Sequence, residues 1–174
     1  RLSSSEQYKG YDTVIAALAD LKKLNKPFTY LLAGKADAME KARVEQLIAS
    51  HDLKNEVKLI GYLPDTEITD HFLLADAFIM PSTGEGFGIV FIEAAACGCQ
   101  VIGGNVDGST DALLNGELGQ MVNPEVLGEV SAAIEHAIKN KAHQSQKQQA
   151  LAYERFGFEQ YVDKVNCLID ESVN

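Results

Sequence analysis

The sequence predicts an α/β fold, in which a parallel β-sheet is covered by helices on both faces and is followed by a helical C-terminal extension. Two observations favour this fold. Apolar runs of strand length alternate with longer stretches of helical periodicity between residues 12 and 139. These runs are apolar at successive positions, as in parallel strands buried between two layers of helices. Beyond residue 139 the patterns are helical only.

The elements follow from local patterns. Apolar residues at helical spacing, such as Val14, Ile15 and Leu18, define the helices, and runs that stop at glycine or proline define the strands. Thr66 is expected to cap the third helix and Pro124 to open the sixth. The expected order is helix 12–24, strand 28–33, helix 38–50, strand 57–60, helix 66–74, strand 77–80, helix 89–97, strand 100–103, a short helix near Asp111, strand 119–122, helix 125–139 and the tail helices 143–155 and 158–170.

Composition and charge narrow the range of functions. The chain has 174 residues, of which 46% are hydrophobic and 23% charged, and this suits one globular domain with its own core. Its formal net charge of −10 argues against non-specific binding to nucleic acid or to anionic lipid. No apolar run reaches the roughly 20 residues that a membrane-spanning helix needs. The first residues are polar and unlike a signal peptide. The chain also starts without methionine and in a pattern typical of the middle of a domain, so we expect a fragment of a longer protein.

The cysteine and histidine patterns favour neither disulfides nor a metal site. Cys97, Cys99 and Cys167 have no framework spacing, so we expect free thiols in a reducing compartment. The Cys97-Gly98-Cys99 pair lacks a second pair of ligands, and the four histidines are scattered. We therefore expect no metal, no bound cofactor and no catalytic cysteine.

The stretch from Pro81 to Glu93 is the most informative part of the chain. The expected strand 77–80 ends at Pro81, a glycine-rich turn follows, and a helix begins near Ile89. A glycine turn that opens a helix presents free backbone N–H groups and the positive end of the helix dipole. Such a place can hold a phosphate group without a metal ion.

Two carboxylates accompany this turn: Glu85 lies within it, and Glu93 lies eight positions later. Carboxylates accept hydrogen bonds from sugar hydroxyls, so phosphate and sugar together suggest a nucleotide-sugar. Helix 89–97 is apolar nearly all round and is expected to be buried, where Glu93 needs a partner such as a ribose diol. The residues alone leave other interpretations open: Glu93 pairs with a basic side chain or reaches the surface, and Glu85 is a solvated turn residue.

Three loops directly follow expected strands, namely 61–65, 82–88 and 103–110. In parallel sheets, ligands bind at the carboxyl ends of the strands. We therefore expect these three loops to converge on one cleft.

Several segments of the chain, in their order along the sequence, resemble the donor-binding half of the retaining glycosyltransferases of family 4, which have the GT-B fold. The resemblance covers most of residues 1–156. The segments that carry it are Arg1 with the Lys9-Gly10 pair, Leu31 to Gly34, Val57 to Leu63, Ala75 to Ala77, Pro81 to Gly103 with its two glutamates, and Gly116 to Pro124. It implies a Rossmann-like three-layer α/β/α domain over residues 1–156, one half of a GT-B fold. Residues 157–174 would form a C-terminal helix that packs back on a missing N-terminal domain.

The same resemblance implies a role for each site residue. As catalytic residues, Arg1 and Lys9 would hold the diphosphate and neutralise the departing nucleotide, and Glu85 would contact the transferred sugar. Glu93 would bind the ribose hydroxyls. The other residues expected to bind the donor, the last two of them near the base, are Gly86, Phe87, Gly88, Ile89, Val90, Tyr62 and Leu63.

For the intact enzyme, the resemblance implies hexosyl transfer from a nucleoside diphosphate sugar to an unknown acceptor, with retention of anomeric configuration and without a metal ion. A UDP-sugar is the favoured donor. The acceptor site would lie in the missing domain, so we expect this chain alone to bind the donor but to transfer sugar poorly. No nucleic-acid partner is expected. The expected location is cytoplasmic, with any membrane contact made by the missing domain.

Three alternatives belong to other functional classes. A Rossmann dehydrogenase fits poorly, because Gly84, Gly86 and Gly88 are not spaced as G-x-G-x-x-G and no acidic residue ends the next strand. A GT-B-fold epimerase or phosphorylase stays open, as does a nucleotide-sugar-binding domain without catalysis.

Overall fold

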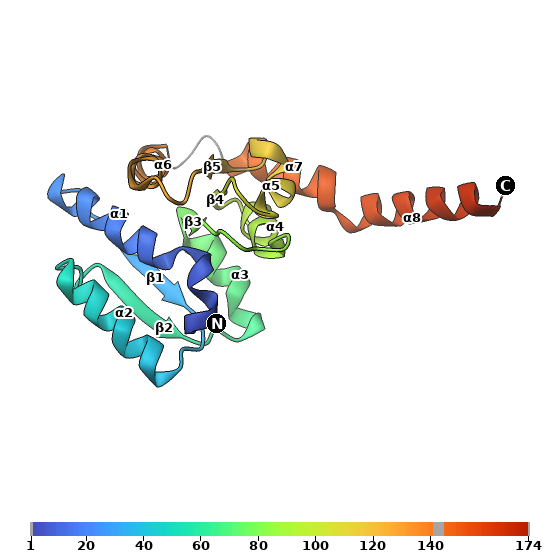
Figure 1. The fold of residues 1–174 in the computed structure, drawn as a ribbon. Helices are drawn as coiled ribbons and strands as arrows, with labels where there is room; N and C mark the ends of the chain where they lie inside the picture. The colour runs from blue at the N-terminus through green and yellow to red at the C-terminus, as the bar shows by residue number, and fades with distance from the viewer. Residues whose placement is uncertain (1, 141–144, 174) are drawn as a thin grey trace.

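The computed structural model describes residues 2–140 and 145–173 (Figure 1). It confirms the predicted α/β fold, since helices and strands alternate along the chain and the strands of each described ladder run parallel. The strands are β1 (Tyr30–Ala33), β2 (Val57–Gly61), β3 (Ala77–Met80), β4 (Gln100–Gly104) and β5 (Gln120–Val122). The helices are η1 (Ser4–Lys9), α1 (Tyr11–Lys23), α2 (Ala38–Ser50), α3 (Asp65–Leu74), α4 (Ile89–Ala96), α5 (Ser109–Ala112), η2 (Leu114–Gly116), α6 (Leu127–Lys139), α7 (Ser145–Phe156) and α8 (Phe158–Val173).

Among the described residues, the strands form two parallel ladders. β1 pairs with β2, whereas β4 lies between β3 and β5. An isolated parallel bridge joins Leu2 to Ala36, just beyond the end of β1. Within each ladder the carboxyl ends of the strands share one edge, which is where the sequence places the candidate loops.

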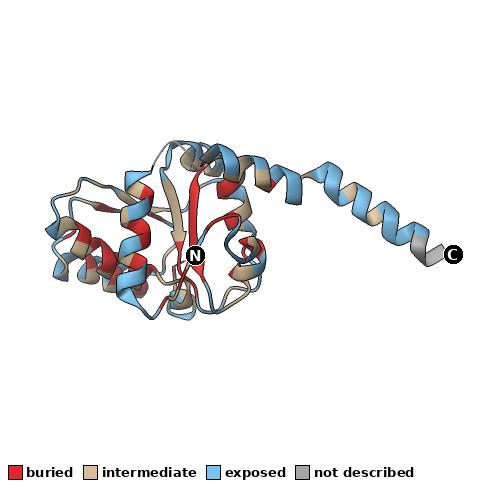
Figure 2. Cartoon of the chain, turned by 90° about the horizontal axis from the view of Figure 1, so that it is seen from above, coloured by how far each residue is buried: buried red, intermediate tan, exposed pale blue. Residues whose placement is uncertain are grey.

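Helices bury the strands on two sides. One core cluster joins α1, α2 and α6 to strands of both ladders, with Val14, Val44, Ile102 and Ile134 among its members. A second cluster surrounds the fully buried Phe91 of α4 and includes residues of β3, β4 and α7. Figure 2 shows the buried residues gathered in this α/β part of the molecule.

Two of the predicted helix starts are wrong. Helix α3 begins at Asp65 behind an extended Pro64, so Thr66 lies inside the first turn and is not the cap. Helix α6 begins at Leu127 and not near Pro124. The reason is local, because Asn123 Oδ1 accepts a hydrogen bond from Glu125 N at 3.0 Å and so folds this segment into a turn ahead of the helix.

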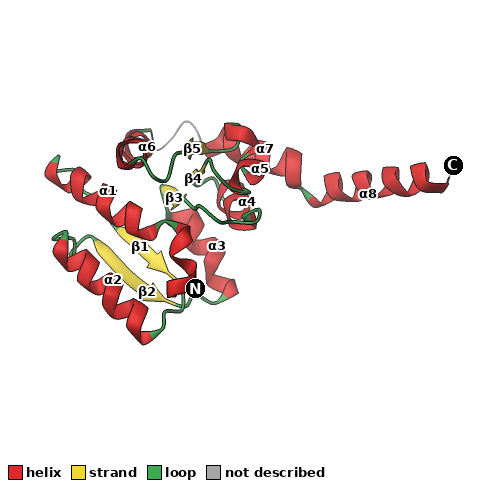
Figure 3. Ribbon diagram, in the orientation of Figure 1, coloured by secondary structure: helices red, strands yellow, loops and turns green. Residues whose placement is uncertain are grey.

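The two tail helices differ in their packing. Helix α7 packs against α4, and Gln149 Nε2 donates a hydrogen bond to Ala96 O at 2.8 Å. Helix α8 extends away from the α/β part (Figure 3). Residues 143 and 144 of the predicted tail helix lie outside the described residues. None of the described helices is long and apolar enough to cross a membrane.

Candidate functional site

The turn from Pro81 to Gly88 connects β3 to α4, and η1 supports one side of it. Thr83 N donates a hydrogen bond to Tyr8 O at 2.8 Å. A Cβ placed on Gly84 would lie 3.4 Å from the ring of Tyr8, so this ring packs directly on the turn. The helix η1, which carries Lys9, is therefore adjacent to the turn.

The loop after β4 supports the other side of the turn. Asp107 Oδ2 accepts hydrogen bonds from Glu85 N at 2.7 Å and from Ser82 Oγ at 2.8 Å. Gly108 N donates to Glu85 O at 3.0 Å. Of the three loops expected to converge on one cleft, 82–88 and 103–110 thus meet directly. Sequence reasoning missed Asp107, because an Asp-Gly pair after a strand predicts a loop but not the distant segment that its carboxylate contacts.

Three glycines face backbone carbonyl oxygens of this turn at very short range. A Cβ would lie 2.2 Å from Pro81 O at Gly10, 2.2 Å from Ser82 O at Gly104, and 2.0 Å from Gly86 O at Gly108. Distances this short leave no room for a side chain at any of the three positions.

Gly88 sets the start of α4. Its φ of 87° lies in the left-handed region that favours glycine, and a Cβ there would lie 2.6 Å from the buried ring of Phe91. The N–H groups at the start of α4, including those of Ile89 and Val90, have no partner one turn earlier in the helix. Together with the helix dipole, they form an end that suits an anion.

Glu93 corrects one expectation. Helix α4 buries Phe91, Ala94 and Ala95 on one face, but Glu93 is exposed on the other, so the expected burial is wrong for this residue and the alternative in which it reaches the surface is the one observed. An eight-residue helix that covers a sheet leaves one side uncovered, even when nearly every residue on it is apolar. Glu93 opens into a pocket of about 480 Å³ between α3 and α4, which is lined by Asp65, Ile68, Thr69, Phe72, Glu93 and Cys97.

The loop predicted to meet the base leads into this same pocket. Gly61 ends β2 with a φ of 73°, and its carbonyl accepts a hydrogen bond from Gly34 N at 2.7 Å. Tyr62 follows with 67% of its surface exposed, and Leu63 is half-buried. After Pro64 the chain enters α3, whose first residue, Asp65, lines the pocket that contains Glu93.

Lys9 ends η1, close to the turn but not free of partners. Its Nζ lies 3.3 Å from Glu6 Oε1 and 5.9 Å from the centre of the Tyr8 ring. A bound diphosphate would therefore compete with Glu6 for this cation. Arg1, the other predicted cation, lies outside the described residues.

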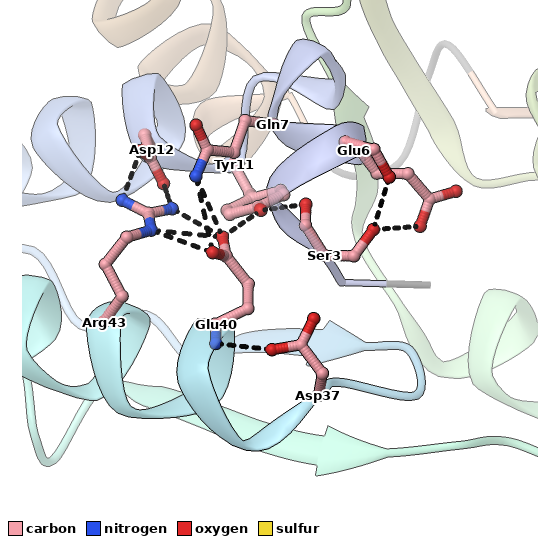
Figure 4. Close-up of polar contacts among 9 residues, drawn as sticks. Ser3, Glu6, Gln7, Tyr11, Asp12, Asp37, Glu40 and Arg43 are labelled. Carbon is pink, nitrogen blue, oxygen red and sulfur yellow. Dashed lines mark hydrogen bonds and ion pairs between the residues drawn. The ribbon is translucent and has the colours of Figure 1, made fainter.

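A buried polar cluster fastens η1 and α1 to α2 (Figure 4). Glu40 is 3% exposed and accepts hydrogen bonds from Tyr11 Oη and from Arg43 Nη2, the latter at 2.7 Å. Arg43 also binds both carboxylate oxygens of Asp12 at 2.8 Å, and Gln7 Nε2 approaches Glu40 at 3.4 Å. Hydrogen bonds from Arg43 outweigh burial and lower the pKa of Glu40 to about 2. The cluster thus holds a buried negative charge beside the helix that carries Lys9.

Two acidic side chains, those of Asp65 and Glu93, line the pocket but are not part of a cluster of described residues that could hold a metal ion. Across residues 2–140 and 145–173, no group of three or more His, Cys, Asp or Glu side chains is arranged to hold a metal ion. Cys97 lines the pocket as a free thiol, and burial raises its pKa.

The family model for glycosyl transferases group 1 matches residues 2–155. The chain belongs to this family. Glycogen synthase of Mycobacterium tuberculosis is 30% identical over 137 residues, which are 79% of this chain and 33% of that protein. A GDP-mannose-dependent alpha-(1-6)-phosphatidylinositol monomannoside mannosyltransferase of Mycolicibacterium smegmatis is 27% identical over 133 residues, or 72% of this chain and 34% of that protein.

Solved members of this fold extend the likeness over nearly all of the chain. The crystal structure of Anabaena Alr3699/HepE in complex with UDP superposes with a TM-score of 0.79 and 28% identity, covering 99% of this chain and 46% of that one. The chain therefore spans between a third and a half of the length of these relatives. The predicted half of a GT-B glycosyltransferase is confirmed as to family and fold.

Proposed function

We propose that this chain is the donor-binding half of a glycosyltransferase that moves a hexose from a nucleoside diphosphate sugar to an acceptor, with retention of configuration and without a metal ion. Family membership supports the reaction class. The observation that carries the donor assignment is the exposed Glu93, which opens into a pocket of about 480 Å³ on the helix whose N-terminus follows the glycine turn. One short helix thus offers both a carboxylate that can accept hydrogen bonds from sugar hydroxyls and an N-terminus that can bind an anion.

The proposed roles divide the donor among the surrounding segments. Glu93 binds the ribose hydroxyls, and the backbone from Gly86 to Val90 binds the diphosphate at the start of α4. Lys9, together with Arg1, neutralises charge on the departing nucleotide, and Glu85 contacts the sugar. The loop with Tyr62 and Leu63 meets the base.

The rest of the enzyme would supply the acceptor. The solved relative is about twice as long as this chain, which covers 46% of it, and this supports a second domain across the donor site. Apolar side chains on the described part of α8, including Phe158 at 77% exposure and Leu168 at 66%, favour packing of this helix on that domain.

The first test is calorimetric titration of the 174-residue chain with UDP in the presence of EDTA, followed by GDP and ADP. We expect one nucleotide to bind, and Glu93→Ala to weaken it about 10- to 100-fold, which is the usual effect of losing hydrogen bonds to a charged group. Glu67→Ala is the matched control, because Glu67 is an exposed glutamate on α3 that does not line the pocket.

The outcomes separate the parts of the proposal. Equal affinities of the Glu93→Ala and Glu67→Ala variants would contradict the ribose assignment. Binding that disappears in EDTA and returns with Mg²⁺ would contradict metal independence. Rapid sugar transfer by this chain alone would contradict the need for a second domain.

A further inference from the structure

Both backbone polar groups of Glu85 are held by one short loop. Its N–H donates to Asp107 Oδ2 at 2.7 Å, and its carbonyl accepts from Gly108 N at 3.0 Å. Bonds at both ends of one residue restrict its φ and ψ angles together, so the direction in which its side chain leaves the backbone is also fixed. Glu85 is the residue assigned to the donor sugar, so this loop controls a group that matters for specificity.

The two oxygens of Asp107 serve different purposes. Oδ1 accepts from Ser109 N at 3.0 Å, two residues along, and so shapes its own loop at the start of α5. Oδ2 accepts from Glu85 N and from Ser82 Oγ, which lie 22 and 25 positions away in the sequence. A loop-forming aspartate needs only the first contact. The second joins the β4–α5 loop to the turn that carries Glu85.

The charge of Asp107 suits this task. Burial raises the pKa of its carboxyl, but hydrogen bonds from Ser109, Glu85 N and Ser82 outweigh burial and leave the pKa below its ordinary value. The carboxylate therefore stays ionised at neutral pH, and hydrogen bonds to an ionised acceptor are stronger than neutral ones.

We propose that Asp107 is a positioning residue that fixes the backbone of Glu85 and thereby aims its side chain at the donor sugar. The inference rests on the proposed function, because it assumes that Glu85 meets the sugar. Asp107 is assigned no contact with the donor, because both of its carboxylate oxygens already accept hydrogen bonds from Ser82, Glu85 and Ser109. Its loss is therefore felt in recognition of the sugar and not in recognition of the nucleotide.

The test compares the affinity for a nucleotide with that for its hexose conjugate, using UDP with UDP-glucose and GDP with GDP-mannose as probes. In wild type we expect the conjugate to bind more tightly than the nucleotide. Asp107→Asn replaces one acceptor oxygen with an NH2 group, which would then face N–H or O–H donors instead of accepting from them. This variant should abolish the advantage of the conjugate while changing nucleotide affinity less than about twofold. Asp111→Asn is the matched control, because it makes the same charge change on an exposed residue of α5.

A double-mutant cycle shows whether the effect passes through Glu85. Glu85→Gln should also abolish the advantage, and adding Asp107→Asn to it should cause no further loss. An Asp107→Asn variant that weakens nucleotide and conjugate equally has lost structure and not sugar positioning, and this result would overturn the inference. Additive losses would overturn it as well.

Two further outcomes complete the test. If Asp107→Asn does not fold, Ser82→Ala removes one donor to Oδ2 and should lower the advantage part-way; an unchanged advantage overturns the inference. Wild type that binds a nucleotide and its conjugate equally also overturns it, because no sugar contact then exists to be positioned. Wild type that binds none of the probes instead contradicts the proposed function itself.

Discussion

At the scale of single residues, Gly88 is the position where the turn becomes a helix. Replacement by alanine should destabilise the chain by about 1–3 kcal/mol, since a Cβ is strained at a φ of 87° and would lie 2.6 Å from the ring of Phe91. Gly86→Ala is the control, because a Cβ there meets nothing within 4 Å. Urea unfolding of both variants measures the difference, and equal losses of stability would contradict this account of Gly88.

Glu85 and Glu93 show how far a sequence determines a site residue. The glycine turn, the following helix and the spacing of the two carboxylates could be predicted, because they depend on neighbours along the chain. The exposure of Glu93 was one of several interpretations that the sequence left open, because it depends on where α3 lies beside α4. Asp107 was missed for the same reason, since its partners are 22 and 25 positions away.

At the scale of elements, the Glu40 cluster joins α2 to η1 and α1, and it should make stability depend on pH. The folded pKa of Glu40, about 2, lies below its ordinary value of 4.5. Its contribution is therefore complete above pH 4.5 and is lost as the pH falls from 4.5 towards 2. At pH 7 we expect Glu40→Gln to cost about 2 kcal/mol, and the difference from wild type to shrink in acid.

Urea unfolding at pH 7, 5 and 3 measures this difference. Glu45→Gln is a control on the same helix. Glu45 is exposed, and its ion pair with Lys41 has an N–O distance of 3.9 Å, so this pair contributes little to stability in water. A wild-type advantage over Glu40→Gln that stays constant down to pH 3 would show that the charge of Glu40 does not contribute as described.

Elements were easier to predict than their boundaries. Strand β3 was predicted at its observed residues, because its apolar run begins after Asp76, stops at Pro81 and is too short for a helix. The start of α6 was wrong by two residues, because the side chain of Asn123 takes the N–H of Glu125 and delays the helix. Hydrogen bonds of this kind compete with helix formation on nearly equal terms, so sequence pattern alone does not decide between them.

At the scale of the whole molecule, α8 contributes little to the α/β part. A chain that ends at Gly157 should unfold in urea with a free energy within about 1 kcal/mol of the full chain, because the large apolar residues Phe158, Leu168 and Ile169 are exposed. A loss above about 2 kcal/mol would show that α8 belongs to this core. The shorter chain should also associate less with itself in size-exclusion chromatography, since it lacks an exposed apolar surface.

The arrangement of the strands is a property that the sequence did not reveal. The alternation of strand and helix predicted parallel pairing, which both ladders confirm. The division into a pair and a triplet depends on which strands meet in space, and single-strand patterns carry no information about neighbours. The predicted boundary between residues 156 and 157 stays a prediction, which the truncated chain would test.

The three glycines that approach the carbonyl oxygens of the turn have a thermodynamic consequence. They lie at the start of α1, the end of β4 and the start of α5, and a Cβ added to any of them would lie 2.0–2.2 Å from a carbonyl oxygen of the turn. The turn can shift appreciably only if these segments shift with it. A donor would therefore meet a surface that is already ordered, and little of its binding energy would be consumed in freezing the protein.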